Sequence, residues 1–170
     1  MPADLEARVK QLEAKVQEMT DREAIRDLRY RYHEYVNEGK FQEITGLFTE
    51  DGELEFAHLG HAKGRAEIQK FFGGIAGNAS GEPQRPRITW VKQFIHNHVI
   101  QLHGDHAHGF SYLEAKPIYG GEAFLVAARY DDDYVREKGE WKFKKMGLVP
   151  YFMVPLKEGW AQADKLKMRP

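Results

Sequence analysis

Histidines are concentrated in one short stretch of this 170-residue chain. Five of the eight lie in residues 93–109, which read QFIHNHVIQLHGDHAHG. On a strand, His96 and His98 would share one face, a spacing that can hold zinc when a third ligand is available. No carboxylate lies at a characteristic ligand spacing, so we expect no metal. Because histidine titrates near neutral pH, His96 is a candidate catalytic base. Its strand face lines either the pocket or the outer side of the sheet, and a bulge would exchange the two. The three histidines that flank the turn HGD are expected to be exposed.

Three other residues have side chains suited to acid–base chemistry. Tyr32 lies on the apolar stripe of a helix, where its hydroxyl either polarises a substrate oxygen or finds a partner in the core. His58 shares a strand face with Phe56 and is expected at the wall of a pocket. Glu114 would become a usable base near pH 7 in an apolar pocket, because burial raises the pKa of a carboxyl group. The alternative is a solvated Glu114 paired with Lys116.

Composition excludes several classes of function. The net charge is −1, without the basic excess of a nucleic-acid-binding protein. The absence of cysteine rules out disulfides, thiolate metal sites and a cysteine nucleophile. Without eighteen consecutive apolar residues or an apolar leader, no membrane association is expected, and the expected location is the cytoplasm. The acidic run at 131–133 lacks the spacing of a calcium loop and is interpreted as a solvated strand end.

The elements that must position these residues begin with two predicted helices. Apolar residues recur at alternating spacings of four and three at Leu5, Val9, Leu12, Val16 and Met19. This stripe predicts an N-terminal helix over residues 1–20 that packs at a subunit interface or on its own domain. The sequence TDRE, with Thr20 and Glu23, has the pattern of a capping box and predicts the start of a second helix. Gly39 is expected to end that helix, and a short helix is predicted at 41–48.

Strands dominate the rest of the chain. A strand at 53–58 and a helix in 64–77 are followed by long alternating segments at 87–102, 106–117 and 121–149. This order predicts an α+β fold: a cone-shaped barrel of a curved, mostly antiparallel sheet that N-terminal helices close. The barrel domain is expected to span residues 21–155, with a tail at 156–170. A sheet curved in this way encloses a pocket, the usual place for a small hydrophobic ligand.

The sequence resembles the SnoaL-like family of the nuclear transport factor 2-like superfamily. The resemblance rests on DREAIRDLRYRYHEYVNEGKFQEITGLFTEDGELEF at 21–56, GRAEIQKFF at 64–72, the histidine-rich stretch, and RYDDDYVREKGEWKFKKM near the end. It implies a cone around a deep hydrophobic pocket and enzymes that work without a cofactor, among them dehydratases, a dehydrochlorinase and lyases that release formaldehyde. It also implies a homo-oligomer, with a trimer favoured.

The resemblance further implies where catalytic residues should lie. The family tyrosine falls on Tyr32, but the family aspartate is replaced by Asn37 and the family histidine by Gln93. An arginine of the bile-acid dehydratases falls on Pro150. Comparison with scytalone dehydratase turns the even-numbered face of 106–117 inward, which would place Tyr112, with Glu114 and Lys116, in the pocket.

The resulting hypothesis is a cofactor-independent lyase that acts on a hydrophobic, aromatic or polycyclic hydroxylated molecule. The base would be Glu114, His58 or His96, and Tyr32 would bind the reacting oxygen. The expected substrate-binding residues are Asn37, Phe56, Gln93, Tyr112, Lys116 and Tyr151. Tyr151 either covers the pocket or packs with the tail outside the barrel. The alternatives are a non-catalytic binding module and a ketosteroid-type isomerase.

Overall fold

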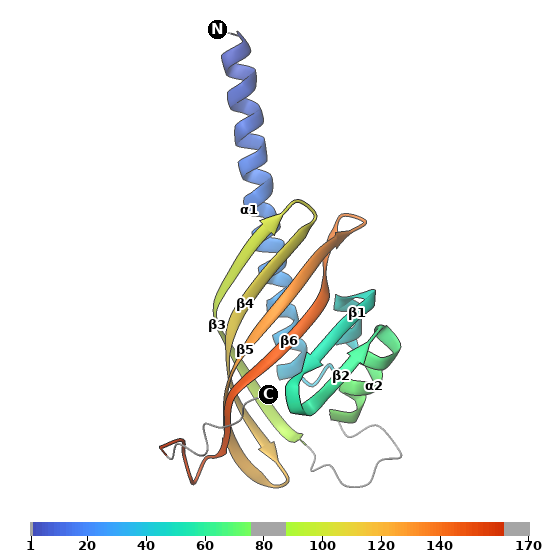
Figure 1. The fold of residues 1–170 in the computed structure, drawn as a ribbon, viewed down its shortest axis with the longest axis vertical. Coiled ribbons are helices and arrows are strands. Elements are labelled where there is room, and N and C mark those ends of the chain that lie inside the picture. The colour runs from blue at the N-terminus through green and yellow to red at the C-terminus, as the bar shows by residue number, and fades with distance from the viewer. Residues whose placement is uncertain (1, 76–87, 162–170) are drawn as a thin grey trace.

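A curved sheet with helices against one face forms the body of the molecule (Figure 1), and the computed structural model describes residues 2–75 and 88–161. The strands follow the order β2-β1-β6-β5-β4-β3. They are β1 (Phe48–Phe56), β2 (Gly60–Lys63), β3 (Ile88–His103), β4 (His106–Tyr119), β5 (Glu122–Glu137) and β6 (Glu140–Pro155). Only β1 and β6 pair in parallel. The predicted α+β cone is confirmed, although among the described strands the sheet stays open.

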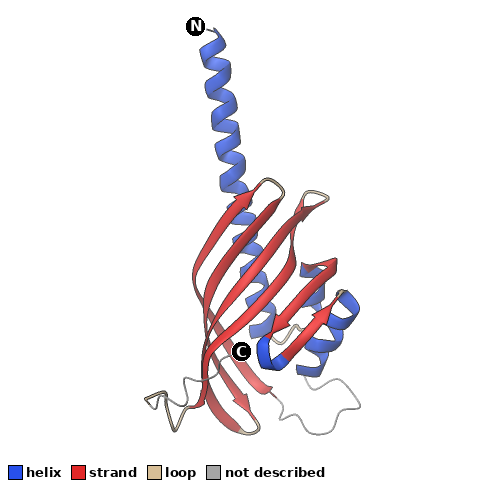
Figure 2. Ribbon diagram, viewed as in Figure 1, coloured by secondary structure: helices blue, strands red, loops and turns tan. Residues whose placement is uncertain are grey.

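One helix occupies the place of the two predicted at the N-terminus (Figure 2). α1 runs without a break over Pro2–Asn37, so the predicted helix start at TDRE is wrong. Thr20 Oγ1 donates to the carbonyl oxygen of Val16 at 2.9 Å, the bond that a hydroxyl makes inside a helix. No glycine or proline interrupts residues 5–36, so nothing in the chain ends the first helix.

The second half of α1 packs on the inner face of the sheet. Its buried residues Ile25, Leu28, Tyr32 and Val36 recur at the spacing of one helix face. Each such side chain, fully buried, contributes roughly 1.5–3 kcal/mol. Gly39, with φ +71°, follows the end of the helix as predicted.

Shorter helices complete this layer. The predicted helix at 41–48 is the 3-10 helix η1 (Glu43–Leu47), and a second, η2 (Ala57–Leu59), follows β1. α2 (Arg65–Ile75) confirms the helix predicted after residue 64 and contacts β1 and β2.

A bulge in β3 decides which of its side chains face inward. Two residues lie between His96 and Val99, but only one lies between their partners on β4, Tyr112 and Phe110. Asn97 absorbs the extra residue at φ +49°, a left-handed conformation that asparagine tolerates. The inward face therefore passes from odd-numbered Gln93 to even-numbered His98.

The sheet ends where β6 meets the segment that follows it. β6 ends at Pro155, and the backbone N–H of Leu156 donates to the carbonyl of Ala123 at 2.8 Å. Trp160 stacks on Phe152 with ring centroids 5.6 Å apart. The remainder of the predicted tail, residues 162–170, lies outside the described residues.

Candidate functional site

A buried ion pair joins α1 to the inner face of the sheet. Arg29 comes from α1 and Asp132 from β5, and both side chains are fully buried. The guanidinium lies 4.3 Å from the ring centroid of Tyr130 and 4.8 Å from that of Phe143. Burial raises the pKa of Asp132, while the guanidinium and the Tyr134 hydroxyl oppose that rise. The two charges cancel, so the surroundings are polar without carrying net charge.

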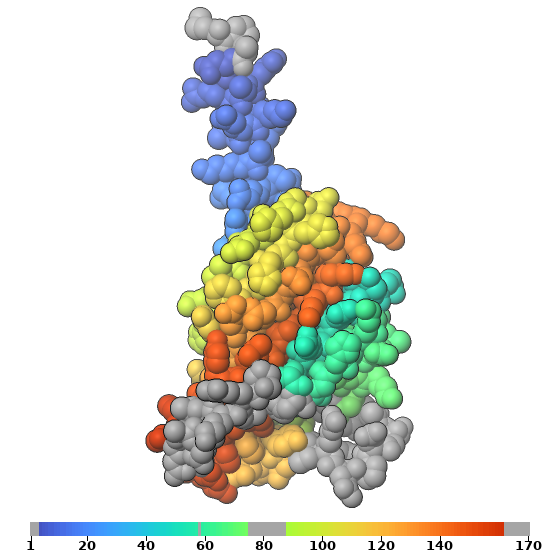
Figure 3. Space-filling model, viewed as in Figure 1, coloured from blue at the N-terminus to red at the C-terminus, as the bar shows by residue number. Residues whose placement is uncertain are grey.

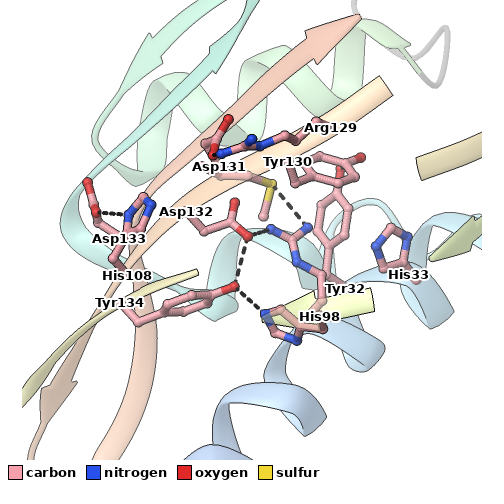
Figure 4. A network of polar contacts seen from close by, with 12 residues as sticks. Tyr32, His33, His98, His108, Arg129, Tyr130, Asp131, Asp132, Asp133 and Tyr134 are labelled. Carbon is pink, nitrogen blue, oxygen red and sulfur yellow. Dashed lines mark hydrogen bonds and ion pairs between the residues drawn. The ribbon is translucent and has the colours of Figure 1, made fainter. Parts of the chain in front are cut away.

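The ion pair continues into a chain of hydrogen bonds that ends at His98 (Figure 4). The Tyr134 hydroxyl donates to Asp132 Oδ2 at 2.8 Å and lies 3.1 Å from His98 Nε2. Because the tyrosine proton is given to the carboxylate, its oxygen accepts from His98 Nε2–H. His98 Nδ1 therefore carries the lone pair.

A second chain of polar contacts converges on the side-chain oxygen of Gln93. His33 Nδ1 lies 3.0 Å from Gln93 Oε1, and the Tyr130 hydroxyl lies 3.4 Å from the same atom. An amide oxygen can only accept, so His33 carries its proton on Nδ1 and its lone pair on Nε2. Tyr32 completes the chain, with its hydroxyl 3.5 Å from that of Tyr130.

Asn37 holds the backbone of Gln93 in place. Its Nδ2 donates to the Gln93 carbonyl oxygen at 2.9 Å, and its Oδ1 accepts from the Gln93 N–H at 2.7 Å. Both polar atoms of the Asn37 side chain are thus occupied by the backbone N–H and C=O of a single residue of β3. The pair fixes the position of Gln93 and supplies neither a charge nor a base.

The residues of these two chains, together with Asn37, are called the polar cluster below. Burial shifts the pKa values of its titratable side chains. Burial and the nearby Arg29 lower the pKa of His33 well below its usual value near 6.5. The same two causes, with Arg26, lower the pKa of His98 to about 4. Burial also raises the pKa of both Tyr32 and Tyr130. At neutral pH the imidazoles of His33 and His98 are therefore neutral and the phenols of Tyr32 and Tyr130 are protonated.

Several buried polar atoms of this region have no hydrogen-bond partner among the described residues. They are Arg29 Nε, His33 Nε2, His98 Nδ1, Ser111 Oγ and Asp132 Oδ1. Two of the five are imidazole lone pairs, which can accept a proton. Native proteins leave few buried polar groups unpaired, and such groups call for a functional or structural explanation.

The predicted inward orientation of the even-numbered face of β4 is wrong. The odd-numbered residues of β4 are buried, and Tyr112, Glu114 and Lys116 lie on the outer face. Glu114 pairs there with Lys116 at 3.1 Å, with 43 % of its side chain exposed. The predictions of Glu114 as a base and of Tyr112 and Lys116 as substrate contacts are corrected accordingly. Side chains along β4 alternate between the two faces, as the sequence predicted. That alternation does not say which of the two faces packs against the helices.

Two other predicted site residues also lie outside the polar cluster. His96 is exposed, because it precedes the bulge and points opposite to Gln93. Tyr151 of β6 is 44 % exposed and lies beside Tyr112 on the outer face, with ring centroids 6.4 Å apart. Neither residue is placed to act in a pocket on the inner face.

The other predicted residues fall into two groups. Tyr32, Asn37 and Gln93 meet in the cluster, and Phe56 is buried beside Tyr130 with ring centroids 6.0 Å apart. β1 ends at Phe56, so His58 lies in η2 rather than on the strand. The side chain of His58 lies outside the described residues.

Six polar residues of the cluster were not predicted as site residues: Arg29, His33, His98, Tyr130, Asp132 and Tyr134. On α1, Arg29 and His33 precede Asn37 at intervals of four, so the three form a row along one helix face. A polar row next to a buried apolar stripe is a signal that would have found them. On β5, Asp132 was interpreted as solvated; it points inward, whereas Asp131 pairs with Arg129. Tyr134 follows Asp132 on the same face.

Metal and membrane sites receive no support from the residues described. No group of three or more histidine, cysteine, aspartate or glutamate side chains in residues 2–75 and 88–161 could hold a metal ion. No helix in these ranges is long and apolar enough to cross a membrane.

Comparison with known sequences finds one family match and one set of remote relatives. The profile of the family described as SnoaL-like domain matches residues 17–147. An uncharacterised protein of Mycobacterium tuberculosis is 23% identical over 131 residues, which cover 75% of this chain and 83% of that protein.

Solved structures share the fold. Hexachlorocyclohexane dehydrochlorinase LinA-type3 from Novosphingobium barchaimii superposes with a TM-score of 0.73 at 20% identity, over 84% of this chain and 94% of that one. A candidate scytalone dehydratase from Novosphingobium aromaticivorans gives 0.70 at 23% identity, over 81% and 89%. At these identities the likeness establishes the fold alone.

Proposed function

Because this chain belongs to the SnoaL-like domain family, we propose that it is a cofactor-independent lyase acting on a hydrophobic, hydroxylated aromatic or polycyclic molecule. Similar folds include a dehydrochlorinase and a candidate scytalone dehydratase, both of which fit elimination chemistry. The neutral polar cluster suits an uncharged substrate, since the Arg29–Asp132 pair leaves no net charge to attract an ion.

His33 is the base in this proposal. Its Nδ1–H is held by Gln93 Oε1, so the lone pair sits on Nε2, which is buried and has no partner among the described residues. Burial keeps the imidazole neutral at pH 7 and able to accept a proton. This one observation carries the proposal, because Asn37 and Gln93 supply no base.

The reaction would proceed by elimination. His33 Nε2 takes a proton from carbon, the electron pair forms the alkene, and the carbon–oxygen bond breaks. The departing oxygen takes a proton from Tyr32, whose contact with Tyr130 at 3.5 Å is long enough to be given up. In the variant that releases formaldehyde, the proton comes from the hydroxyl of a hydroxymethyl group. The carbon–carbon bond to that group breaks, and its electron pair forms the alkene as the carbon–oxygen bond breaks.

Mass spectrometry of a panel of hydroxylated aromatic and polycyclic compounds, incubated in H2O and in D2O, tests the reaction class. Loss of water or formaldehyde supports the lyase, and deuterium on carbon supports reversible proton abstraction. His33→Gln should lower the rate of turnover on the order of a hundredfold or more. The control variant His106→Gln, at an exposed position, should leave that rate unchanged. If turnover persists in His33→Gln but is lost in His98→Gln, the base is His98 rather than His33.

A non-catalytic binding module is the second candidate. Both polar atoms of Asn37 are already used on the backbone of Gln93, which is the arrangement of a structural residue. Saturable binding of a panel compound, with no change in its mass and no deuterium uptake, would favour this function. A product of unchanged mass but altered structure would indicate a ketosteroid-type isomerase.

A further inference from the structure

The first half of α1 projects beyond the sheet (Figures 1 and 3). Its large apolar side chains form an exposed stripe. Contacts with the sheet begin near Asp21, which binds Trp141 and Arg136 of the strands. The side chains before it are between 45 and 65 % exposed at Leu5, Val9, Leu12, Val16 and Met19. On an isolated surface helix, exposed apolar residues are scattered singly. Five large apolar residues in one row instead form a contiguous patch, which is typical of an interaction surface.

The described part of the domain, residues 21–75 and 88–161, does not cover this stripe. From Val16 to the buried Ile25 the helix advances nine residues, which is about two and a half turns. Ile25 therefore points to the opposite side of the helix from Val16. The apolar face changes sides along α1, so the stripe faces away from the direction in which the sheet lies.

The spacing of the stripe is that of a coiled-coil seam. Leu5, Leu12 and Met19 occupy d positions of a heptad, and Val9 and Val16 occupy a positions. The far half of α1 is anchored on the sheet, so the projecting half is preformed and loses little conformational entropy when it pairs.

Charges beside the seam select the orientation of the partner. The g positions are basic, Arg8 and Lys15, and the e positions Glu6 and Glu13 are acidic. Parallel helices bring g next to the following e of the partner, so Arg8 meets Glu13 of a second copy, twice by symmetry. Antiparallel helices would bring g to g and e to e, facing like charges.

We propose that the stripe from Leu5 to Met19 packs in parallel against the same stripe of a second copy of this chain. Within the described chain neither Arg8 nor Glu13 forms an ion pair, so both are free to form one between copies. Valine at a with leucine at d favours two strands, whereas the family resemblance favours three subunits. Helices are parallel in both assemblies, and the inference is independent of the proposed reaction.

Disulfide trapping in the full chain tests the pairing, because the protein has no cysteine of its own. Leu5→Cys should form a linked dimer at least roughly tenfold faster than Ala7→Cys, since pairing raises the local thiol concentration. Ala7 lies at the same height on the opposite side of the helix. Equal rates for the two variants would overturn the proposal. So would a disulfide that forms only when Leu5→Cys is mixed with Met19→Cys, because that pair reports antiparallel helices.

A charge exchange provides an independent test by sedimentation equilibrium at low salt. Glu13→Lys places a second positive charge beside Arg8 of the other copy, at both symmetry-related contacts, and should weaken self-association roughly tenfold. The double variant Arg8→Glu with Glu13→Lys should restore it, and Ala14→Lys, on the outer face, should leave it unchanged. Failure of the double variant to recover would contradict the assigned charge pair. All three positions are exposed, so folding of the domain should be unaffected, which thermal unfolding checks.

Discussion

At the scale of single residues, the Arg29–Asp132 pair sets the character of the interior. Two full charges are buried among aromatic rings, and each has one polar atom without a partner. A buried pair of this kind contributes little net stability compared with apolar residues of the same size, but breaking it leaves an uncompensated charge. Its role is to place Tyr134, and through it His98, in one defined geometry.

Removing half of this pair should therefore be costly. Asp132→Asn leaves Arg29 charged and buried, and we expect a loss of about 3–5 kcal/mol in the free energy of unfolding. The neighbouring variant Asp131→Asn breaks a half-exposed pair and should cost less than about 1 kcal/mol. Urea unfolding of both variants measures the difference.

The double variant Arg29→Met with Asp132→Leu extends this test. Replacing both charges by apolar groups should recover much of the stability lost in Asp132→Asn. If the double variant is as unstable as Asp132→Asn, the attraction between the two charges stabilises the fold. The loss in Asp132→Asn would then not come from the unpaired charge of Arg29.

At the scale of the elements, β3 and β4 shape the site through their close approach. Gly109 of β4 faces the bulge, and a Cβ atom added to it would lie 2.9 Å from the carbonyl oxygen of Val99 and 3.4 Å from His98 Nε2. The Tyr134 ring would lie 3.2 Å away. Only glycine lets the bulge approach closely enough for His98 to reach Tyr134.

Gly109→Ala should thus destabilise the chain by about 1–3 kcal/mol, the usual cost of overpacking. The backbone carbonyl of Val99 cannot rotate away as a side chain would. Gly46→Ala is the matched control, because nothing lies within 4 Å of its added Cβ and its φ is not positive. Thermal unfolding compares the two, and equal melting temperatures would refute the close approach.

At the scale of the whole molecule, the two faces of the sheet differ in chemistry. The inner face holds the polar cluster, while the outer face exposes Trp90, Phe94, Val99, Tyr112, Val149 and Tyr151. A set of exposed large apolar side chains on one sheet face is typical of an interaction surface. The expected homotrimer stays a prediction, and this face and the projecting helix are the two surfaces it would use.

The free energy of unfolding should depend on pH through the two buried histidines. The pKa of His98 is about 4 and that of His33 is well below 6.5, whereas unfolded histidines titrate near 6.5. Between these values the unfolded chain binds more protons than the folded chain. Stability is therefore fully present above about pH 6.5 and is lost as the pH falls, by up to about 1.4 kcal/mol per pH unit for each histidine.

Urea unfolding across this pH range measures the effect in the intact chain. His98→Asn should reduce the slope, because one of the two titrating groups is gone. His106→Asn, at an exposed position of the hairpin, should leave it unchanged. A wild-type stability that does not fall below pH 6.5 would contradict the assigned protonation states.

By itself, the sequence determined the class of fold and the long strands of its second half, and the family resemblance pointed to Tyr32, Asn37 and Gln93 together. These follow from local spacing and from matched motifs, which need no knowledge of distant contacts. Which side of each strand faces the helices was decided only by the tertiary structure. One extra residue in a strand, such as Asn97 in the bulge of β3, turns all the side chains that follow to the opposite face. Packing against α1 determines which face is buried. Glu114 and His96 were therefore predicted on the wrong face of the sheet. The ion pair between Arg29 and Asp132 could not be predicted from local spacing, because the two residues are 103 positions apart in the sequence.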